Sequence, residues 1–234
     1  IFEDSGNIYL ISSDSLSGEL IIFQSKNNGE NWSNAYKLDN RKWKTTPTEV
    51  LIRNDHIYLT MDAECETAIK KGYSANAAIS PILLRAKCGT DLTVKENWTF
   101  SSEMPYSDIM QGKTAEKVDY IDVPNNYGDG KTVGWSMGNL FQIYDKQQMW
   151  YDPSMSSFFV YMNGSSGSQG YAILLKITEN ANGSMTPSFV ETVNAKKKLF
   201  FVPMPGGNRR FCVIYDEKTG LYWQRIKASF NCKE

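Results

Sequence analysis

Short apolar runs separated by polar turn residues follow one another along the chain, without the spacing of apolar positions that an amphipathic helix requires. The clearest pair, residues 49–53 and 57–61, flanks the turn residues Asn54, Asp55 and His56. Both runs are rich in β-branched and aromatic residues, which predicts a β-hairpin. The same pattern predicts further strands at residues 6–11, 20–24, 81–87, 158–161, 171–177, 199–202, 209–215 and 220–226. Residues 63–78, rich in Ala, Glu and Lys, are expected to form a short helix or a long loop.

The strands are grouped into repeating units. A tryptophan follows a strand and a polar turn at Trp32, Trp98, Trp150 and Trp223, with a loose period of about 60 residues. A period of this length, made of hairpins, is typical of propeller blades, in which each four-stranded sheet covers its faces with its neighbours. A β-sandwich would also give many short strands, but the recurring tryptophan favours a propeller. We therefore predict an all-β protein.

Residues 25–32, Ser-Lys-Asn-Asn-Gly-Glu-Asn-Trp, predict the turn of a hairpin. Asn27 and Asn28 tolerate positive φ and can bond their own backbone, Gly29 takes a left-handed conformation without penalty, and the Ser25 hydroxyl can bond across the turn. The segment resembles the Asp box, S-x-D-x-G-x-x-W, of sialidases and related propellers, with Asn27 where that family has Asp. In the family the box is a structural staple, so we expect Trp32→Ala to destabilise the protein by roughly 3–5 kcal/mol without touching an active site.

A second stretch extends the resemblance. Residues 205–216, followed by Gly220-Leu221-Tyr222-Trp223, look like the closing blade of bacterial sialidase-like propellers with BNR repeats. The resemblance implies a sialidase-type β-propeller over residues 1–234 as a single domain. Sialidase propellers have six blades and about four are visible here, so the chain is either part of a six-bladed propeller or a four-bladed variant.

The composition restricts the classes of binding partner that the protein is expected to have. A formal net charge of −1 gives no electrostatic case for nucleic acid, and no apolar run is long enough to span a membrane. The chain begins at Ile1, which we interpret as a processed or excised piece, so a missing signal peptide does not decide its location. We expect a monomer that is secreted, periplasmic or on the cell surface, with a glycan as its ligand.

The cysteines do not have metal-ligand spacing, so we expect no zinc site and no cofactor. The pairs Cys65–Cys88 and Cys212–Cys232 could form disulfides, and buried free thiols are an equal alternative.

The candidate catalytic residues are the carboxylates Asp62 and Glu116. Asp62 follows a predicted strand, where a blade opens at one end of a propeller, and Glu116 lies in the region that we align with a pocket glutamate of the family. Either could act as a general acid or base if burial raised its pKa, and a solvated loop carboxylate is the alternative. The resemblance also implies three arginines that clamp the carboxylate of sialic acid, and this set cannot be assembled here. Arg85, within an apolar strand, is the best candidate for substrate binding, with an edge-facing side chain as the alternative.

Aromatic residues outside the repeats are a further indication of sugar binding, because flat rings stack on sugar faces. We choose Trp43 and Trp135, each flanked by polar or small residues, as candidate contacts, with core packing as the alternative.

These observations lead to two hypotheses about function. The first is an exo-acting, sialidase-like glycoside hydrolase, and the second is a non-catalytic propeller that binds glycan or protein. The family resemblance favours the first and the missing arginines favour the second or a substrate other than sialic acid; we take the sialidase-like hydrolase as the interpretation and the binding propeller as the alternative.

Overall fold

The computed structural model describes residues 1–44, 49–110, 134–164, 171–192, 198–199, 201–204 and 211–226. Within them the chain is built almost entirely of β-strands in successive antiparallel sheets. The first sheet has the order β1-β2-β3-β4 and consists of Phe2–Asp4, Asn7–Ser13, Leu20–Ser25 and Tyr36–Asp39. The second has the order β5-β6-β7-β8 and consists of Val50–Arg53, His56–Glu64, Ile79–Lys87 and Trp98–Phe100. Each strand pairs with the next one in sequence, as in a propeller blade.

The third sheet repeats this meander. Strands β9 to β12 are Trp135–Phe141, Ser157–Gly164, Tyr171–Glu179 and Met185–Ser188, and β15, Phe201–Pro203, pairs with the start of β11. Two smaller ladders follow, β13 with β14 (Val190–Glu191 and Lys198–Leu199) and β16 with β17 (Phe211–Asp216 and Leu221–Ile226). Short helices α1, Glu66–Lys70, and α2, Tyr106–Met110, and a 3-10 turn, Lys95–Asn97, lie between strands. The helix expected within residues 63–78 is therefore α1.

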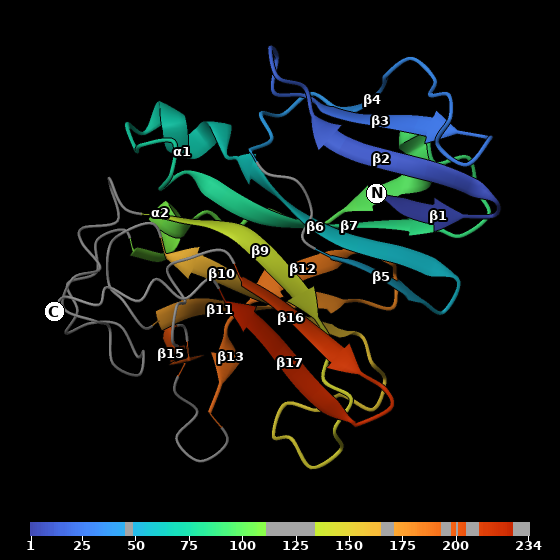
Figure 1. Cartoon of the computed structure of the whole chain (residues 1–234). Coiled ribbons are helices and arrows are strands. Elements are labelled where there is room, and N and C mark those ends of the chain that lie inside the picture. The colour runs from blue at the N-terminus through green and yellow to red at the C-terminus, as the bar shows by residue number, and fades with distance from the viewer. Residues whose placement is uncertain are drawn as a thin grey trace, which may run out of the picture.

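The sheets stack face to face in chain order (Figure 1). One buried cluster joins β1–β4 to β5–β8 and includes Leu20, Ile22, Leu59 and Leu84. A second joins β5–β8 to β9–β12, and the β16–β17 hairpin lies against β9 on the far side of the third sheet. This radial series of meanders confirms the all-β, propeller-type fold, with about four units among the described residues.

The middle sheet explains why its strands are nearly continuous apolar runs. In β6 all seven residues between His56 and Glu64 are buried, and β7 is buried over most of its length. A strand covered on both faces loses the alternation of apolar and polar positions. Its hairpin turn has the expected chemistry, because Asn54 and Asp55 both have positive φ, 47° and 57°.

The turn at residues 25–32 has the hydrogen bonds expected of it. Ser25 Oγ accepts from Gly29 N at 2.8 Å and donates to Asn27 Oδ1 at 3.0 Å, and Asn31 N donates to Asn27 Oδ1 at 2.9 Å. The side-chain oxygen of Asn27 thus accepts hydrogen bonds that an aspartate carboxylate could accept at this position. Trp32, whose ring is expected to pin this turn to the sheet, is 39% exposed, so it is covered only in part.

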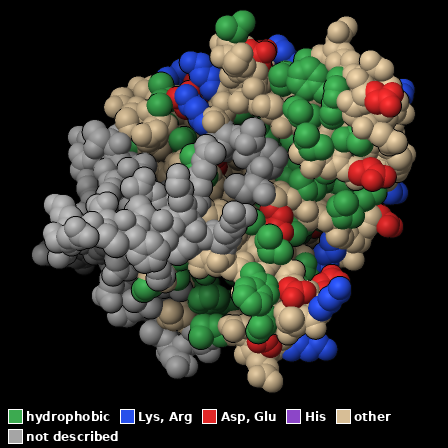
Figure 2. Space-filling view, viewed as in Figure 1, with side chains coloured by type: hydrophobic (Ala, Val, Ile, Leu, Met, Phe, Trp, Pro, Cys, Tyr) green, Lys and Arg blue, Asp and Glu red, His purple; other side chains and the backbone are tan. Residues whose placement is uncertain are grey.

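Two further expectations are resolved. Cys65 and Cys88 are free thiols, so that disulfide does not form, and Cys232 lies outside the described residues. Among the described residues, no helix has the length and apolar character needed to cross a membrane. Figure 2 shows acidic and basic side chains interspersed on the face in view, with apolar side chains at the surface near β17.

Candidate functional site

Asp62, a candidate general acid or base, is fully buried on β6 at the contact with the third sheet. Its Oδ2 atom accepts a hydrogen bond of 2.6 Å from the backbone N of Met137, a residue with a φ of 59°. The pairing of β9 with β10 shifts register beside this point. Because a positive φ is costly for methionine, the carboxylate stabilises an irregular turn of β9. Its use in catalysis remains a prediction.

Arg85, the candidate substrate-binding residue, points into the same inter-sheet contact. Its guanidinium pairs with Glu179 on β11, and the other oxygen of that carboxylate accepts a hydrogen bond of 2.8 Å from the Tyr58 hydroxyl. Burial and this hydrogen bond raise the pKa of Tyr58. In this arrangement Arg85 links the second sheet to the third, and its charge is already neutralised by a neighbour.

The two tryptophans chosen as sugar contacts are packed inside the protein. Trp43 is buried and donates from Nε1 to Asp39 Oδ2 at 2.9 Å, with the Arg41 guanidinium over its ring. Trp135 is buried and donates from Nε1 to the carbonyl of Ile79 at 2.6 Å. Neither ring presents a free face for stacking, so core packing accounts for both here, and sugar contact by either of them is untested.

Glu116 lies outside the described residues. A carboxylate that the sequence analysis did not select, Glu49, directly precedes β5. Its Oε2 atom is buried without a hydrogen-bond partner among the described residues, and burial raises the pKa of the side chain to about 7. A carboxyl group with such a pKa can donate or accept a proton near neutral pH.

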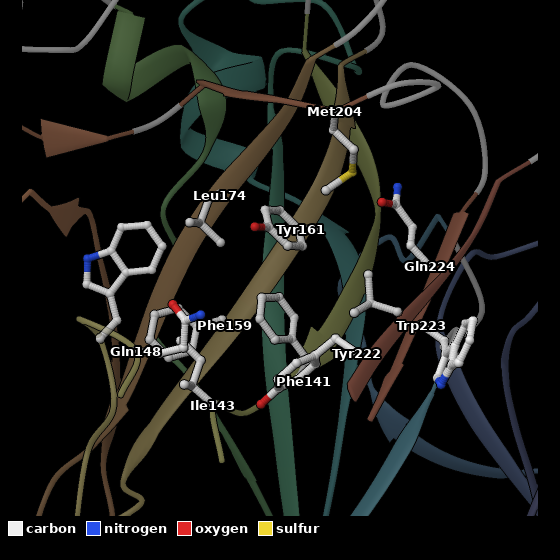
Figure 3. Close-up of a pocket in the computed structure, with 12 residues that line it drawn as sticks. Phe141, Ile143, Gln148, Phe159, Tyr161, Leu174, Met204, Tyr222, Trp223 and Gln224 are labelled. Carbon is white, nitrogen blue, oxygen red and sulfur yellow. The ribbon is translucent and has the colours of Figure 1, made fainter. Parts of the chain in front are cut away.

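A cavity lies elsewhere, between the third sheet and the β16–β17 hairpin (Figure 3), and none of the four predicted residues that the structure describes lines it. Its volume is about 260 Å³. Phe141, Phe159 and Tyr161 form its floor on β9 and β10, and Tyr222 closes it from β17. We call this space the aromatic cavity; its remaining lining residues are Ile143, Gln148, Trp150, Leu174, Met204, Val213, Trp223 and Gln224.

The floor of the aromatic cavity is rigid. The Phe141 and Tyr161 rings stack with their centroids 4.9 Å apart, and the Tyr222 ring meets Phe141 edge-on at 6.3 Å. The Tyr222 hydroxyl donates to the carbonyl of Gln142 and accepts from the backbone N of Tyr144, both at 2.7 Å. These bonds fix the hairpin to the end of β9, and burial raises the pKa of Tyr222 to about 12.

A few polar groups remain available at this apolar surface. Among the described residues, the Tyr161 hydroxyl and the side-chain amides of Gln148 and Gln224 have no hydrogen-bond partner, although all three residues line the cavity. Burial raises the pKa of Tyr161, so its hydroxyl stays protonated and able to donate. Aromatic walls with a small number of polar groups are typical of ligand sites.

The described lining of the aromatic cavity contains no acidic, basic or histidine side chain, and its titratable groups are the hydroxyls of Tyr161 and Tyr222. In the regions that the structure describes, no group of three or more His, Cys, Asp and Glu residues is placed to hold a metal ion.

The cavity could not be recognised from the tryptophans in the sequence, because Trp150 and Trp223 recur with the expected period of the blades, which predicts a role in packing. A usable signal was present in Phe159 and Tyr161, which alternate on one strand and therefore share a face.

No protein-family model matches the chain, and no curated protein sequence matches it. Several solved structures are similar over much of this chain. A protein of unknown function from Dyadobacter fermentans has a TM-score of 0.43 at 9% identity, covering 86% of this chain and 42% of its own. An α-L-arabinofuranosidase from Lactobacillus brevis has a TM-score of 0.41 at 15% identity, covering 82% and 55%. An α-L-arabinanase from Penicillium chrysogenum, in complex with arabinobiose, has a TM-score of 0.40 at 9% identity, covering 94% and 53%. The chain thus spans about half the length of these proteins.

Proposed function

We propose that this protein is a carbohydrate-binding propeller that holds a sugar ring in the aromatic cavity. The observation that carries the proposal is the combination of stacked aromatic side chains with the unpartnered Tyr161 hydroxyl and two side-chain amides. A sugar ring has an apolar C–H face and a rim of hydroxyls, so it matches both parts of this lining.

The size of the aromatic cavity and the absence of charged side chains from its described lining restrict which sugars it could bind. At about 260 Å³ it lies just below the range of roughly 300–1,000 Å³ for drug-sized ligands, which suits one ring. Recognition of sialic acid depends on cations that pair with its carboxylate, and the lining supplies none. We therefore propose a neutral sugar as the ligand of this cavity. A glycan ligand also leads us to propose that the protein works outside the cytoplasm.

Isothermal titration calorimetry with a panel of neutral sugars and a sialoside tests the proposal. We expect a neutral sugar to bind, and Tyr161→Phe to weaken its affinity about threefold to tenfold through loss of one hydrogen bond. Gln224→Ala should act in the same direction. Trp32→Ala, which changes an exposed aromatic residue far from the cavity in sequence, is the matched control and should bind as the wild type does. No binding to any sugar by the folded protein would overturn the proposal.

Hydrolysis of a glycan is the second candidate function, favoured by Glu49, whose burial raises its pKa to about 7. In this proposal Glu49, Asp62 or Glu116 supplies the acid or base, and substrate is cleaved by the sialidase-like chemistry that the sequence suggests. Release of reducing sugar or aryl aglycone should then be lost in Glu49→Gln, Asp62→Asn or Glu116→Gln. Turnover that survives all three substitutions, or no turnover on any substrate, would remove this candidate.

A further inference from the structure

A second cavity adjoins the aromatic one. It has a volume of about 520 Å³ and shares Trp150 and Phe159 with the first. Its other walls come from residues 149–157 and from strands β11 to β13, and they include the side chains of Lys176, Thr178 and Ser188. Its exposed lining is mainly polar, whereas that of the first cavity is mainly apolar. We call it the polar cavity.

The change from an apolar to a polar lining follows a series of paired residues on the neighbouring strands β9, β10, β11 and β12. Phe141 is opposite Phe159, Phe159 is opposite Lys176, and Lys176 is opposite Ser188. Directly opposed residues share a face of a sheet, so this face passes from aromatic at β9 to polar at β12. Within the described residues Lys176 forms no ion pair, which leaves its ammonium group available to a ligand hydroxyl.

The wall between the cavities is fixed in place. Trp150 donates from Nε1 to the carbonyl of Glu191 at 2.9 Å, and its ring lies 6.4 Å from that of Phe159. The loop that carries Trp150 is held by Asp152, which accepts hydrogen bonds from the hydroxyls of Ser154, Ser156 and Ser157 at 2.6, 2.9 and 2.7 Å. Burial acts to raise the pKa of Asp152, but these bonds hold it well below its usual range. The carboxylate therefore stays ionised at neutral pH and can keep accepting these hydrogen bonds.

From this continuity we propose that the ligand is an oligosaccharide of at least two units, with a neutral ring in the aromatic cavity and the next ring beyond Trp150 in the polar cavity. The inference rests on the proposed function and specifies its substrate class. The aromatic cavity alone suits one ring, and the polar cavity supplies hydroxyl and ammonium groups where a second ring would present hydroxyls. Adding a second set of contacts to a bound ring increases affinity because the cost of immobilising the ligand is largely met by the first ring.

The test compares chain lengths by calorimetry. The probes are xylose, xylobiose and xylotetraose, with the corresponding arabinose and glucose series. We expect at least tenfold tighter binding of the disaccharide than of the monosaccharide in one series. Lys176→Met should weaken disaccharide binding about threefold to tenfold and leave monosaccharide binding unchanged, whereas Tyr161→Phe should weaken both. Lys37→Met, at an exposed lysine of the first sheet, is the matched control.

The outcomes separate the two proposals. Equal affinity for one, two and four units would overturn the oligosaccharide inference and leave sugar binding intact, as would an equal effect of Lys176→Met on all lengths. No binding of any sugar would overturn both proposals. Circular dichroism confirms that each variant is folded, and Ser188→Ala replaces Lys176→Met if the latter does not fold, with the same expected selectivity for the longer sugars.

Discussion

The β9–β12 sheet is covered on both faces, and its two faces are packed differently. The face toward β5–β8 belongs to a continuous apolar cluster that includes Phe158, Val160 and Leu175, and it is bridged by the Arg85–Glu179 pair. The face toward β16–β17 carries Phe141, Phe159 and Tyr161, but leaves the aromatic cavity unfilled. The same architecture thus supplies one interface that closes the fold and another that can accept a ligand.

The difference in packing between the two faces suggests that one face contributes mainly to stability and the other mainly to ligand binding. Protein interiors are packed at near-crystalline density, so a space of this size between two sheets loses contacts that packing would otherwise provide. The face toward β5–β8 is packed by the apolar cluster that includes Phe158, Val160 and Leu175, and it should carry more of the stability. The face toward β16–β17 should tolerate substitutions better and respond to ligands. Two predictions test this contrast directly, a third provides a baseline outside both faces, and a fourth concerns a buried carboxylate; they follow in order of decreasing effect.

Phe158 and Phe159 make the sharpest pair, because they are neighbours on β10, each 1% exposed, and face opposite sides of the sheet. Phe158→Ala should lower the free energy of unfolding by about 3–5 kcal/mol, since the ring contacts Tyr58 inside the closed interface. Phe159→Ala should cost about 1–2 kcal/mol less, because its ring already borders a void. Urea unfolding measures both. Equal losses would show that the two interfaces are packed alike.

Arg85→Met removes one partner of the pair that bridges the closed interface. The Glu179 carboxylate would keep its bond from Tyr58 but lose its cation, and we expect a loss of about 2 kcal/mol. This is below the 3–5 kcal/mol of a fully buried pair, because Arg85 and Glu179 side chains are 19% and 21% exposed. Lys37→Met is the control, since the Lys37–Glu19 pair is exposed and should contribute about 0.5 kcal/mol or less. A loss no larger than that of the control would mean that Arg85 does not bridge the sheets.

Trp32→Ala lies in neither interface and provides a baseline. Its side chain is 39% exposed, so the expected loss falls from the 3–5 kcal/mol of a buried ring to about 1–2 kcal/mol. Thermal unfolding measures this loss. Comparing it with the loss caused by Phe159→Ala shows how much more the cavity face contributes to stability than a partly exposed surface turn does. A loss as large as that of Phe158→Ala would show that Trp32 stabilises the protein as strongly as a fully buried ring does.

Glu49 predicts a pH dependence that is unrelated to either interface. Its pKa is raised to about 7 in the folded protein, so the folded state binds its proton more tightly than the unfolded state does. Stability from this group is complete below about pH 4.5 and is lost as the pH rises through 7. After allowance for its partial exposure, Glu49→Gln should remove about 1 kcal/mol of the difference in stability between pH 5 and pH 8. An unchanged pH profile would contradict the raised pKa.

Much of the fold could be predicted from sequence because its signals are local. The turn at Asn54 and Asp55 follows from side chains that tolerate positive φ, and β11 follows from an apolar run bounded by polar residues. The recurrence of Trp32 and Trp98 matches the structure, because each lies at the connection between the third and fourth strands of its sheet. Trp150 does not continue it, since it lies between the first and second strands of the third sheet.

The candidate site could not be predicted in the same way, because burial and partners are long-range properties. Arg85 meets Glu179 across two sheets, and Trp135 is covered by the edge of another strand, so neither role can be inferred from its neighbours in sequence. The aromatic cavity depends on where Tyr222 places the hairpin against β9, which is a contact between residues far apart in the chain.

The most direct test of the central claim follows the methyl group of Met204, which lines the aromatic cavity, in protein labelled with ¹³C at the methionine methyls. Met61, in the core between the first two sheets, is the internal reference, and Met204→Leu assigns the signal. On titration with the neutral sugar that binds in calorimetry, we predict a saturable shift of the Met204 signal and no shift of the Met61 signal. Saturable sugar binding without any change at Met204 would place the ligand elsewhere and contradict the account.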